Sequence, residues 1–399
     1  MNRKFSRALI ATATVAGLVF TGAVVAPSWA VPSYPTAAEV AAAKKSVAAK
    51  KAMIERLDAI IAELEVDADK LSRVAQIKGE AFNQAQDEVD AIAVKVGSLQ
   101  AQADAANAEA DKAKLQLGQL AAQMYRSGAA GTSLNLFLNS SEADDLLYQL
   151  GAQEKIAQQS DEIYQRSIAK QQYAQSLTDQ LKVAKDELAV KASAAKVLFE
   201  EARTAANEVQ SKVDENNRVS KTMYGQLATL RNTAADLERQ RAEGLAAERR
   251  QQQGSANMSA PELYSVGDAD QGKVAVAFDF MKAQLGERYV LGGMGPDIWD
   301  CSGLMKAGYA AAGIYIGTHS ATNQFRTMGA ARKLVPLSEM QVGDLLWYSQ
   351  ESAFDGDKYH VVMFVGAGMM IEAPNPARTV RIVPIRWGEM FPYAGRPSA

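Results

Sequence analysis

Apolar residues recur at every seventh position from Val40 to Met124 without interruption, and this periodicity constrains the fold more than any other feature of the chain. A second, mostly apolar series lies three positions further on and lapses at Lys50 and Lys78. A repeat kept over so many heptads predicts a helix that faces a partner helix along its whole length. With a rise of 1.5 Å per residue, this arm would extend roughly 130 Å.

The arm is interrupted at residues 125–131, which include two glycines. A leucine-rich segment follows, and a second heptad series then runs from Leu181 to Leu237 with a one-residue slip near Val213. Residues 35–250 are also rich in Ala, Gln, Lys, Glu and Asp, a composition that favours helix. These features predict a long all-α antiparallel coiled-coil hairpin over residues 35–250, with an apolar lobe near 126–150. A kinked parallel coiled coil between two chains is the alternative.

The N-terminus has the pattern of an export signal. Three basic residues precede an apolar stretch over residues 8–27, and Ser28-Trp29-Ala30 places small residues where a signal peptidase cleaves. We expect a signal peptide over residues 1–30, with a retained transmembrane anchor as the alternative. No later segment is apolar enough to span a membrane, so we expect a secreted, extracytoplasmic protein. The net charge of −3 argues against nucleic acid as a partner.

The amino-acid composition of the chain changes after residue 250. Residues 251–270 contain a glutamine run, Gly254 and Pro261, and are expected to form a linker. The segment 271–399 is long enough for one globular domain. Helices are predicted over residues 274–285 and 302–312, followed by strands at 345–348, 360–365, 369–373 and 380–383. A helix packed against such an antiparallel sheet is an α+β arrangement.

Cys301 is the single cysteine of the chain. An exported protein with one thiol has no internal disulfide to form, so Cys301 is either an inert buried side chain or a nucleophile. It lies at the start of a predicted helix, where the helix dipole and free amide groups stabilise a thiolate. This position favours the nucleophile.

A thiol nucleophile needs a base and a group that orients the base. Of the two histidines, His319 lies in a polar stretch, whereas His360 begins an apolar strand that can fix its imidazole beside a cleft. Glu372 is a carboxylate within the next apolar strand, where an unpaired buried charge would be costly. We therefore expect Glu372 to orient His360, although a strand glutamate can also point outward.

Taken together, residues 271–393 resemble the catalytic domain of the NlpC-type peptidoglycan hydrolases, which are papain-like cysteine peptidases. The resemblance implies Cys301 as nucleophile, His360 as general base and Glu372 as third member, with no metal or cofactor. It also implies that the free end of the stem peptide binds at Tyr289, Asp300, Ser302 and Ser320. The segments that carry it are Tyr289-Val290-Leu291-Gly292-Gly293, Asp300-Cys301-Ser302-Gly303-Leu304, Val342-Gly343-Asp344-Leu345, and the strand from His360 to Gly366.

Three departures from this family are visible. Leu291 replaces a usual tryptophan, Ile316-Gly317-Thr318-His319-Ser320 replaces a Leu-Pro-Arg-Thr-Ser type segment, and an acidic insert over residues 351–358 precedes His360. None of them removes a catalytic group.

The hairpin carries a second resemblance. Tyr125-Arg126-Ser127-Gly128, the leucine-rich run after it and Asp144-Asp145-Leu146-Leu147 look like the hairpin region of exported wall hydrolases and activators controlled by the FtsEX division complex. This resemblance implies that the extracellular part of FtsX engages the arms.

We therefore expect a cell-wall endopeptidase that cuts stem peptides between D-isoglutamate and meso-diaminopimelate, acts in cell division, and is held inactive by a helix over the Cys301 cleft. A non-enzymatic activator, and a papain-like amidase or acyltransferase, are the alternatives.

Overall fold

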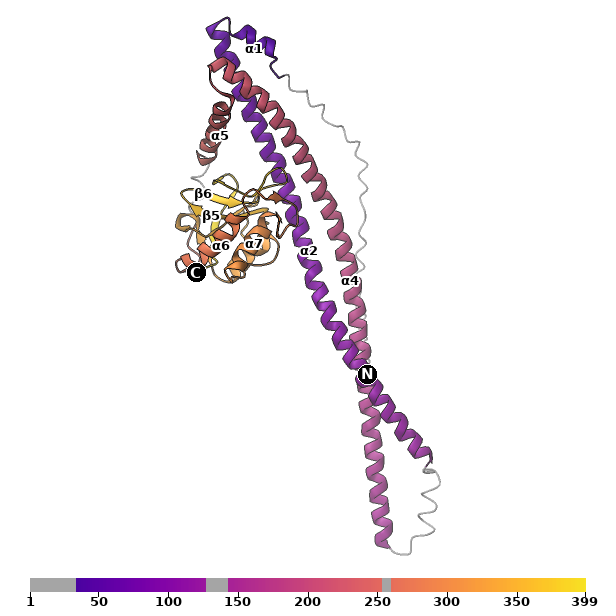
Figure 1. The fold of residues 1–399 in the computed structure, drawn as a ribbon. Coiled ribbons are helices and arrows are strands. Elements are labelled where there is room, and N and C mark those ends of the chain that lie inside the picture. The colour runs from indigo at the N-terminus through magenta and orange to yellow at the C-terminus, as the bar shows by residue number, and fades with distance from the viewer. Residues whose placement is uncertain (1–33, 127–142, 253–259) are drawn as a thin grey trace, which may run out of the picture.

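A long antiparallel helical hairpin dominates the computed structural model, which describes residues 34–126, 143–252 and 260–399. Its arms are α2 (Val47–Arg126) and α4 (Ala143–Arg231), which run side by side within one chain (Figure 1). The predicted fold class, a helical hairpin followed by an α+β domain, is confirmed. The signal peptide and most of the apolar lobe lie outside the described residues. Ion pairs join the arms in antiparallel order, between Lys170 and Glu109 at 2.7 Å, Lys191 and Glu88 at 2.6 Å, and Lys78 and Glu201 at 2.9 Å.

Heptad positions form the contact between the arms. In its middle the layers are mostly alanine, which lets the two helices approach closely, and the layers nearer α1 (Ala37–Ala43) are filled by larger side chains. The apolar series is less continuous in space than in sequence, since Val47 is 88% exposed and Met124 41% exposed. The buried residues are Ala103, Ala106, Ala110, Ala174, Leu177 and Leu181 in the middle, and Leu57, Ile61, Met223, Leu227 and Leu230 near α1.

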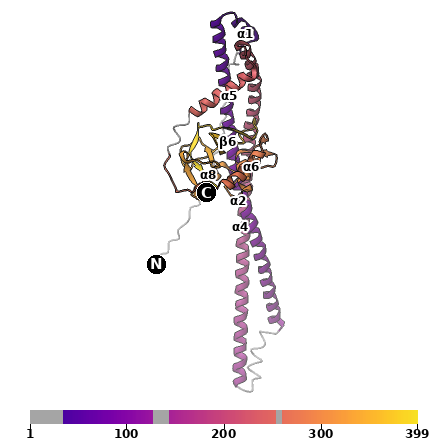
Figure 2. The same ribbon diagram turned by 60° about the vertical axis from the view of Figure 1, so that its left-hand side comes forward.

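The second arm ends earlier than its composition suggests. α4 stops at Arg231, and α5 (Ala235–Gln252) turns back toward the C-terminal domain (Figure 2). Asn232 has a φ of 61°, a left-handed conformation that asparagine tolerates better than most residues and that ends a helix. Arg231 then pairs with Glu238 of α5 and, at 2.5 Å, with Asp58 of α2, which fixes the turn. The heptad pattern could not detect this reversal because both helices share one composition.

The C-terminal domain packs three helices around a six-stranded antiparallel sheet of order β3-β8-β4-β5-β6-β7. The expected helices and strands are present within three residues at each end, and β1, β2, α8, β3, η1 and β8 are additional. Side chains of α7 pack on the sheet in one apolar core. The elements are α6 (Gln271–Ala283), β1 (Arg288–Tyr289), β2 (Ile298–Trp299), α7 (Cys301–Ala311), α8 (Ala321–Ala330), β3 (Leu334–Pro336), the 3-10 helix η1 (Leu337–Glu339), β4 (Leu345–Tyr348), β5 (His360–Gly366), β6 (Met369–Glu372), β7 (Arg381–Pro384) and β8 (Met390–Gly395).

This domain lies beside the hairpin, against α2 (Figures 1 and 2). Polar contacts hold it there, among them an ion pair of 2.8 Å between Arg73 and Glu389 and a hydrogen bond of 3.1 Å from the Asn375 amide to the Ser72 hydroxyl. Within the three described segments, no helix has both the length and the apolar character needed to cross a membrane.

Candidate active site

Cys301 is the first residue of α7 and is 5% exposed. Asp300 caps this helix, because its carboxylate accepts a hydrogen bond of 2.8 Å from the Gly303 amide. A side chain at position 303 would place its Cβ 2.1 Å from the Gly293 carbonyl oxygen, so only glycine allows the loop to approach so closely. In the Asp-Cys-Ser-Gly run, Asp300 thus caps the helix, and Gly303 allows the loop at Gly293 to pack close to the start of α7.

His360 begins β5, and Glu372 ends the neighbouring antiparallel strand β6. The His360 Nε2 and the Glu372 carboxylate are 2.9 Å apart, and both side chains are buried. The other ring nitrogen, Nδ1, is buried without a hydrogen-bond partner among the described residues. The Cys301 sulfur receives a hydrogen bond from the amide of Val361, the residue after His360, so the thiol lies at the start of β5. The structure therefore brings the three predicted catalytic residues to one place.

The thiol and the imidazole are both neutral in this arrangement. Burial raises the pKa of Cys301 well above its usual value, and the negative charges of Asp300 and Glu80 raise it further. Burial also lowers the pKa of His360, an effect that its hydrogen bond to Glu372 only partly offsets. The resting pair is thus a thiol beside a neutral base.

His319, the histidine judged the weaker candidate for the base, has a different partner. Its Nε2 lies 2.8 Å from Asp300. Burial lowers the pKa of His319, but the Asp300 charge outweighs burial, and the pKa is raised overall. This residue therefore orients the helix cap rather than the thiol.

The four residues expected to bind substrate lie around the start of α7. The Ser302 hydroxyl donates to the Asp300 carboxylate at 3.2 Å, and Ser320 is the cap of α8. Tyr289 is buried, and a Cβ added at Gly79 of α2 would lie 3.8 Å from its hydroxyl. Tyr289, Asp300, Ser302 and Ser320 thus line one region that α2 covers, which we call the cleft.

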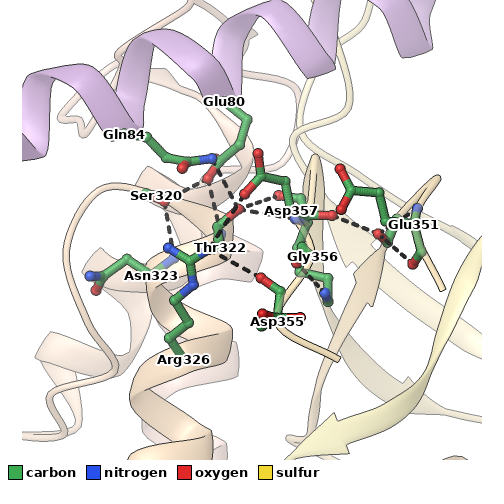
Figure 3. Close-up of polar contacts among 12 residues, drawn as sticks. Glu80, Gln84, Ser320, Thr322, Asn323, Arg326, Glu351, Asp355, Gly356 and Asp357 are labelled. Carbon is green, nitrogen blue, oxygen red and sulfur yellow. Dashed lines mark hydrogen bonds and ion pairs between the residues drawn. The ribbon is translucent and has the colours of Figure 1, made fainter. Parts of the chain in front are cut away.

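A carboxylate from α2 fills this cleft. Glu80 accepts hydrogen bonds from the Ser320 hydroxyl at 2.5 Å and from the amides of Ala321 at 2.9 Å and Thr322 at 3.0 Å. Figure 3 shows Glu80 and Gln84 pointing from α2 toward the start of α8. Burial raises the pKa of Glu80 to about 7, although these three donors oppose the rise.

Further polar residues on the same face of α2 reach the cleft. The Asn83 amide donates to the Asp300 carboxylate at 3.3 Å and to the Ser302 hydroxyl at 3.4 Å. The other contacts are those of Gln76 with the Pro374 carbonyl, Gln84 with the Thr322 hydroxyl at 3.2 Å, and Asp87 with the Thr318 hydroxyl. Positions 76, 80, 83, 84 and 87 share one face of a helix. We call this set, Gln76, Glu80, Asn83, Gln84 and Asp87, the α2 polar face.

The acidic insert over residues 351–358 lies beside the first turns of α8 (Figure 3). The Lys358 amide donates to the Thr322 hydroxyl at 3.0 Å, and Arg326 of α8 donates to the Asp355 carbonyl at 3.1 Å. The insert thus contacts Thr322, which Glu80 and Gln84 also contact.

Sequence reasoning missed two groups of residues at this site. The α2 polar face left no signal in the heptad series, because the nearby lapse at Lys78 belongs to an ion pair with Glu201 of the other arm. Arg381 and Arg386 both bind Glu372, at 2.8 Å and 2.7 Å. In the sequence, these two arginines follow the glutamate of a predicted strand closely. Their contact with Glu372 becomes evident only when the pairing of β6 with β7 is known.

Comparisons with known proteins identify relatives of the C-terminal domain. Residues 286–392 match the NlpC/P60 family. Over 104 residues the chain is 36% identical to the peptidoglycan endopeptidase RipA of Mycolicibacterium smegmatis. This alignment covers 26% of this chain and 19% of that protein. Over 99 residues it is 33% identical to the gamma-D-glutamyl-L-lysine dipeptidyl-peptidase of Bacillus subtilis, with 25% of this chain and 31% of that protein covered.

Among solved structures, the chain is similar to the NlpC/p60 domain of the peptidoglycan hydrolase SagA. Sequence identity is 28%, the TM-score is 0.26, and 31% of this chain and 97% of that one are covered. The chain spans well under half the length of the curated relatives it matches.

Proposed function

Because the C-terminal domain of this chain is an NlpC/P60 domain, we propose that the protein is an exported cysteine endopeptidase that hydrolyses peptidoglycan stem peptides. The observation that carries the proposal is the buried pair of His360 and Glu372, 2.9 Å apart, beside the one thiol of the chain. A buried histidine and carboxylate next to a thiol at a helix N-terminus is the arrangement that thiol catalysis requires.

In this mechanism the neutral His360 accepts the thiol proton as Cys301 attacks the scissile carbonyl carbon. Glu372 stabilises the imidazolium that forms, and His360 then gives its proton to the leaving amine. We propose that the Cys301 backbone amide and a neighbouring donor bind the oxyanion of the tetrahedral intermediate. Water then hydrolyses the thioester. The bond that we propose is cut joins D-isoglutamate to meso-diaminopimelate.

The closed cleft supports a second part of the proposal, that α2 inhibits the enzyme. Glu80 places a carboxylate on the Ser320 hydroxyl and two free amides at the start of α8, a site built to bind an anion. The α-carboxylate of D-isoglutamate carries the same group. We propose that Glu80 occupies the place of this substrate carboxylate, so that α2 and the stem peptide exclude each other.

Activation then requires the domain to leave α2. To change the population from 1% open to 99% open, a partner must bind the open form more tightly by about 5.5 kcal/mol. The hairpin is the part of the chain available for such a partner, and we propose the extracellular part of FtsX, during cell division. Residues 1–30 would act as the export signal, residues 35–250 as the regulatory hairpin, 251–270 as linker and 271–399 as the enzyme.

A defined stem peptide tests the proposed chemistry. The tripeptide L-Ala-γ-D-Glu-diaminopimelate is incubated with a fragment of residues 265–399, and products are identified by mass. We expect L-Ala-D-Glu and free diaminopimelate from the wild-type fragment and none from Cys301→Ala. An intact tripeptide with a folded wild-type fragment would contradict the proposal, and release of free L-Ala would show that a different peptide bond is cut.

A further inference from the structure

Glu372 makes more contacts than a residue that only orients a histidine needs. Arg381 donates to its Oε1 from Nε at 3.0 Å and from Nη2 at 2.8 Å. Arg386 bridges both carboxylate oxygens, reaching Oε1 and Oε2 at 2.7 Å each. With His360 at 2.9 Å, five nitrogen atoms surround one fully buried carboxylate. Two guanidinium groups therefore share one negative charge.

The fold places these arginines by different means. Arg381 lies directly opposite Glu372 in the register of β6 and β7, whereas Arg386 follows β7 and reaches in over Tyr348, with its guanidinium 5.2 Å from the ring. One arginine would suffice to neutralise the carboxylate. The second leaves a net positive charge beside the imidazole, and like charges at this range disfavour protonation of the ring.

Building on the proposed function, we infer that Arg381 and Arg386 are positioning residues of the catalytic triad, which fix Glu372 in its ionised form and hold His360 neutral. A carboxylate alone next to a histidine would stabilise the imidazolium, and at mildly acidic pH the base would then be occupied by a proton before any thiol arrives. With the two arginines, the base stays free to accept the thiol proton at lower pH.

The other groups that face His360 do not account for this effect. Cys301 on α7 and Tyr348 on β4 both have raised pKa values and are neutral. Asp69 on α2 is the charged group of the hairpin that acts on Arg386, and its negative charge opposes the effect of the arginine. Burial lowers the pKa of His360, and the charges of Arg386 and Arg381 lower it further against the pull of Glu372. If the C-terminal domain leaves α2, the opposing charge of Asp69 is removed, and the two arginines lower the pKa of His360 further.

The chain suits a direct measurement because it has only two histidines. Imidazole NMR signals of the full-length protein are followed between pH 4 and pH 8.5, and His319→Gln assigns them. In Arg386→Gln, which keeps a donor and loses the charge, we expect the pKa of His360 to rise by about one unit or more. Arg386→Lys keeps the charge and should shift it by less than half as much. His319, bound to Asp300, serves as the internal reference.

Two outcomes would overturn the inference: an unchanged pKa of His360 in folded Arg386→Gln, or an equal rise in Arg386→Lys. If Arg386→Gln does not fold, Arg381→Gln decides, since the Arg381 side chain is 30% exposed and tolerates replacement better. The pKa is read without substrate, so a failure of the proposed peptidase activity would leave this result intact. In an active enzyme, the acidic limb of kcat/KM should move upward by the same amount as the pKa of His360.

Discussion

Glu80 on α2 and Ser320 at the start of α8 lie 240 positions apart in sequence, yet the Ser320 hydroxyl donates a hydrogen bond of 2.5 Å to the Glu80 carboxylate. Gly79 beside it lets α2 come close enough, since an added Cβ there would lie 2.9 Å from the Leu291 side chain. α2 and the start of α8 thus meet at one buried carboxylate.

Glu80→Ala should expose Cys301. Hydrogen bonds to a charged group are worth about 1.5–3 kcal/mol. Their loss therefore changes the equilibrium constant between the closed and open states by about tenfold or more, in favour of the open state. We expect alkylation of Cys301, the single cysteine, to accelerate by at least that factor in the full-length protein. Glu80→Gln is the matched control, because it removes the same charge near the thiol and keeps the side-chain oxygen. A rate for Glu80→Ala equal to that of wild type would show that Glu80 does not hold the cleft closed.

Closure should weaken as pH rises. Burial raises the pKa of Glu80 to about 7 in the closed state, so that state binds a proton that the open state releases. Its stability is therefore greatest at low pH and is lost as pH rises toward and past 7. The measurement is the ratio of wall digestion rates, wild type over Glu80→Gln, which cancels the pH dependence of the chemistry. We expect this ratio to increase about tenfold or more between pH 5 and pH 8, and a flat ratio would refute the linkage.

The start of α8 should distinguish a carboxylate from an amide. In the Glu80→Ala protein, the stem peptide with D-isoglutamate should have a kcat/KM about tenfold or more above that of the D-isoglutamine peptide, because the amide presents hydrogens to backbone donors. Ser320→Ala in the same background should reduce the difference. If both peptides are cut equally well, Glu80 does not mimic this substrate group.

Glu372→Ala should destabilise the domain as well as inactivate it. The change leaves Arg386, Arg381 and His360 without their shared partner inside the protein, and removing one member of a buried charge cluster costs about 3–5 kcal/mol. Denaturant unfolding of the full-length protein reports this loss in the transition of the C-terminal domain. Cys301→Ala, which removes only a small thiol, should leave that transition within about 1 kcal/mol of wild type. A small effect of Glu372→Ala would mean that the arginines find other partners.

Much of this architecture could be predicted because it is repetitive or local. The heptads specify two paired arms, and the alternation of apolar runs with Gly, Asp and Pro specifies four of the strands. The end of α4 could not be predicted, because the turn at Asn232 interrupts a composition that continues unchanged into α5. Strands β3 and β8 were missed because they are short or contain proline.

At the candidate site, the residue types in the sequence indicated the catalytic residues, but the sequence did not indicate which distant residues contact them. One cysteine and two histidines leave few candidates, and a glutamate in an apolar strand next to His360 has an evident partner. The α2 polar face belongs to a helix whose sequence reads as coiled coil, and its target lies more than 200 residues away. Long-range contacts between polar side chains leave no period in the sequence, so only the structure could join Glu80 to Ser320.

The central claim is that this protein is a thiol peptidase that α2 holds closed, and the rate at which it digests purified diaminopimelate-containing wall tests that claim most directly. Three full-length proteins are compared: wild type, Glu80→Ala with Asn83→Ala, and that double variant with Cys301→Ala. We expect the double variant to digest the wall at least tenfold faster than wild type, and the triple variant not at all. Equal rates for wild type and the double variant, or digestion by the triple variant, would contradict it.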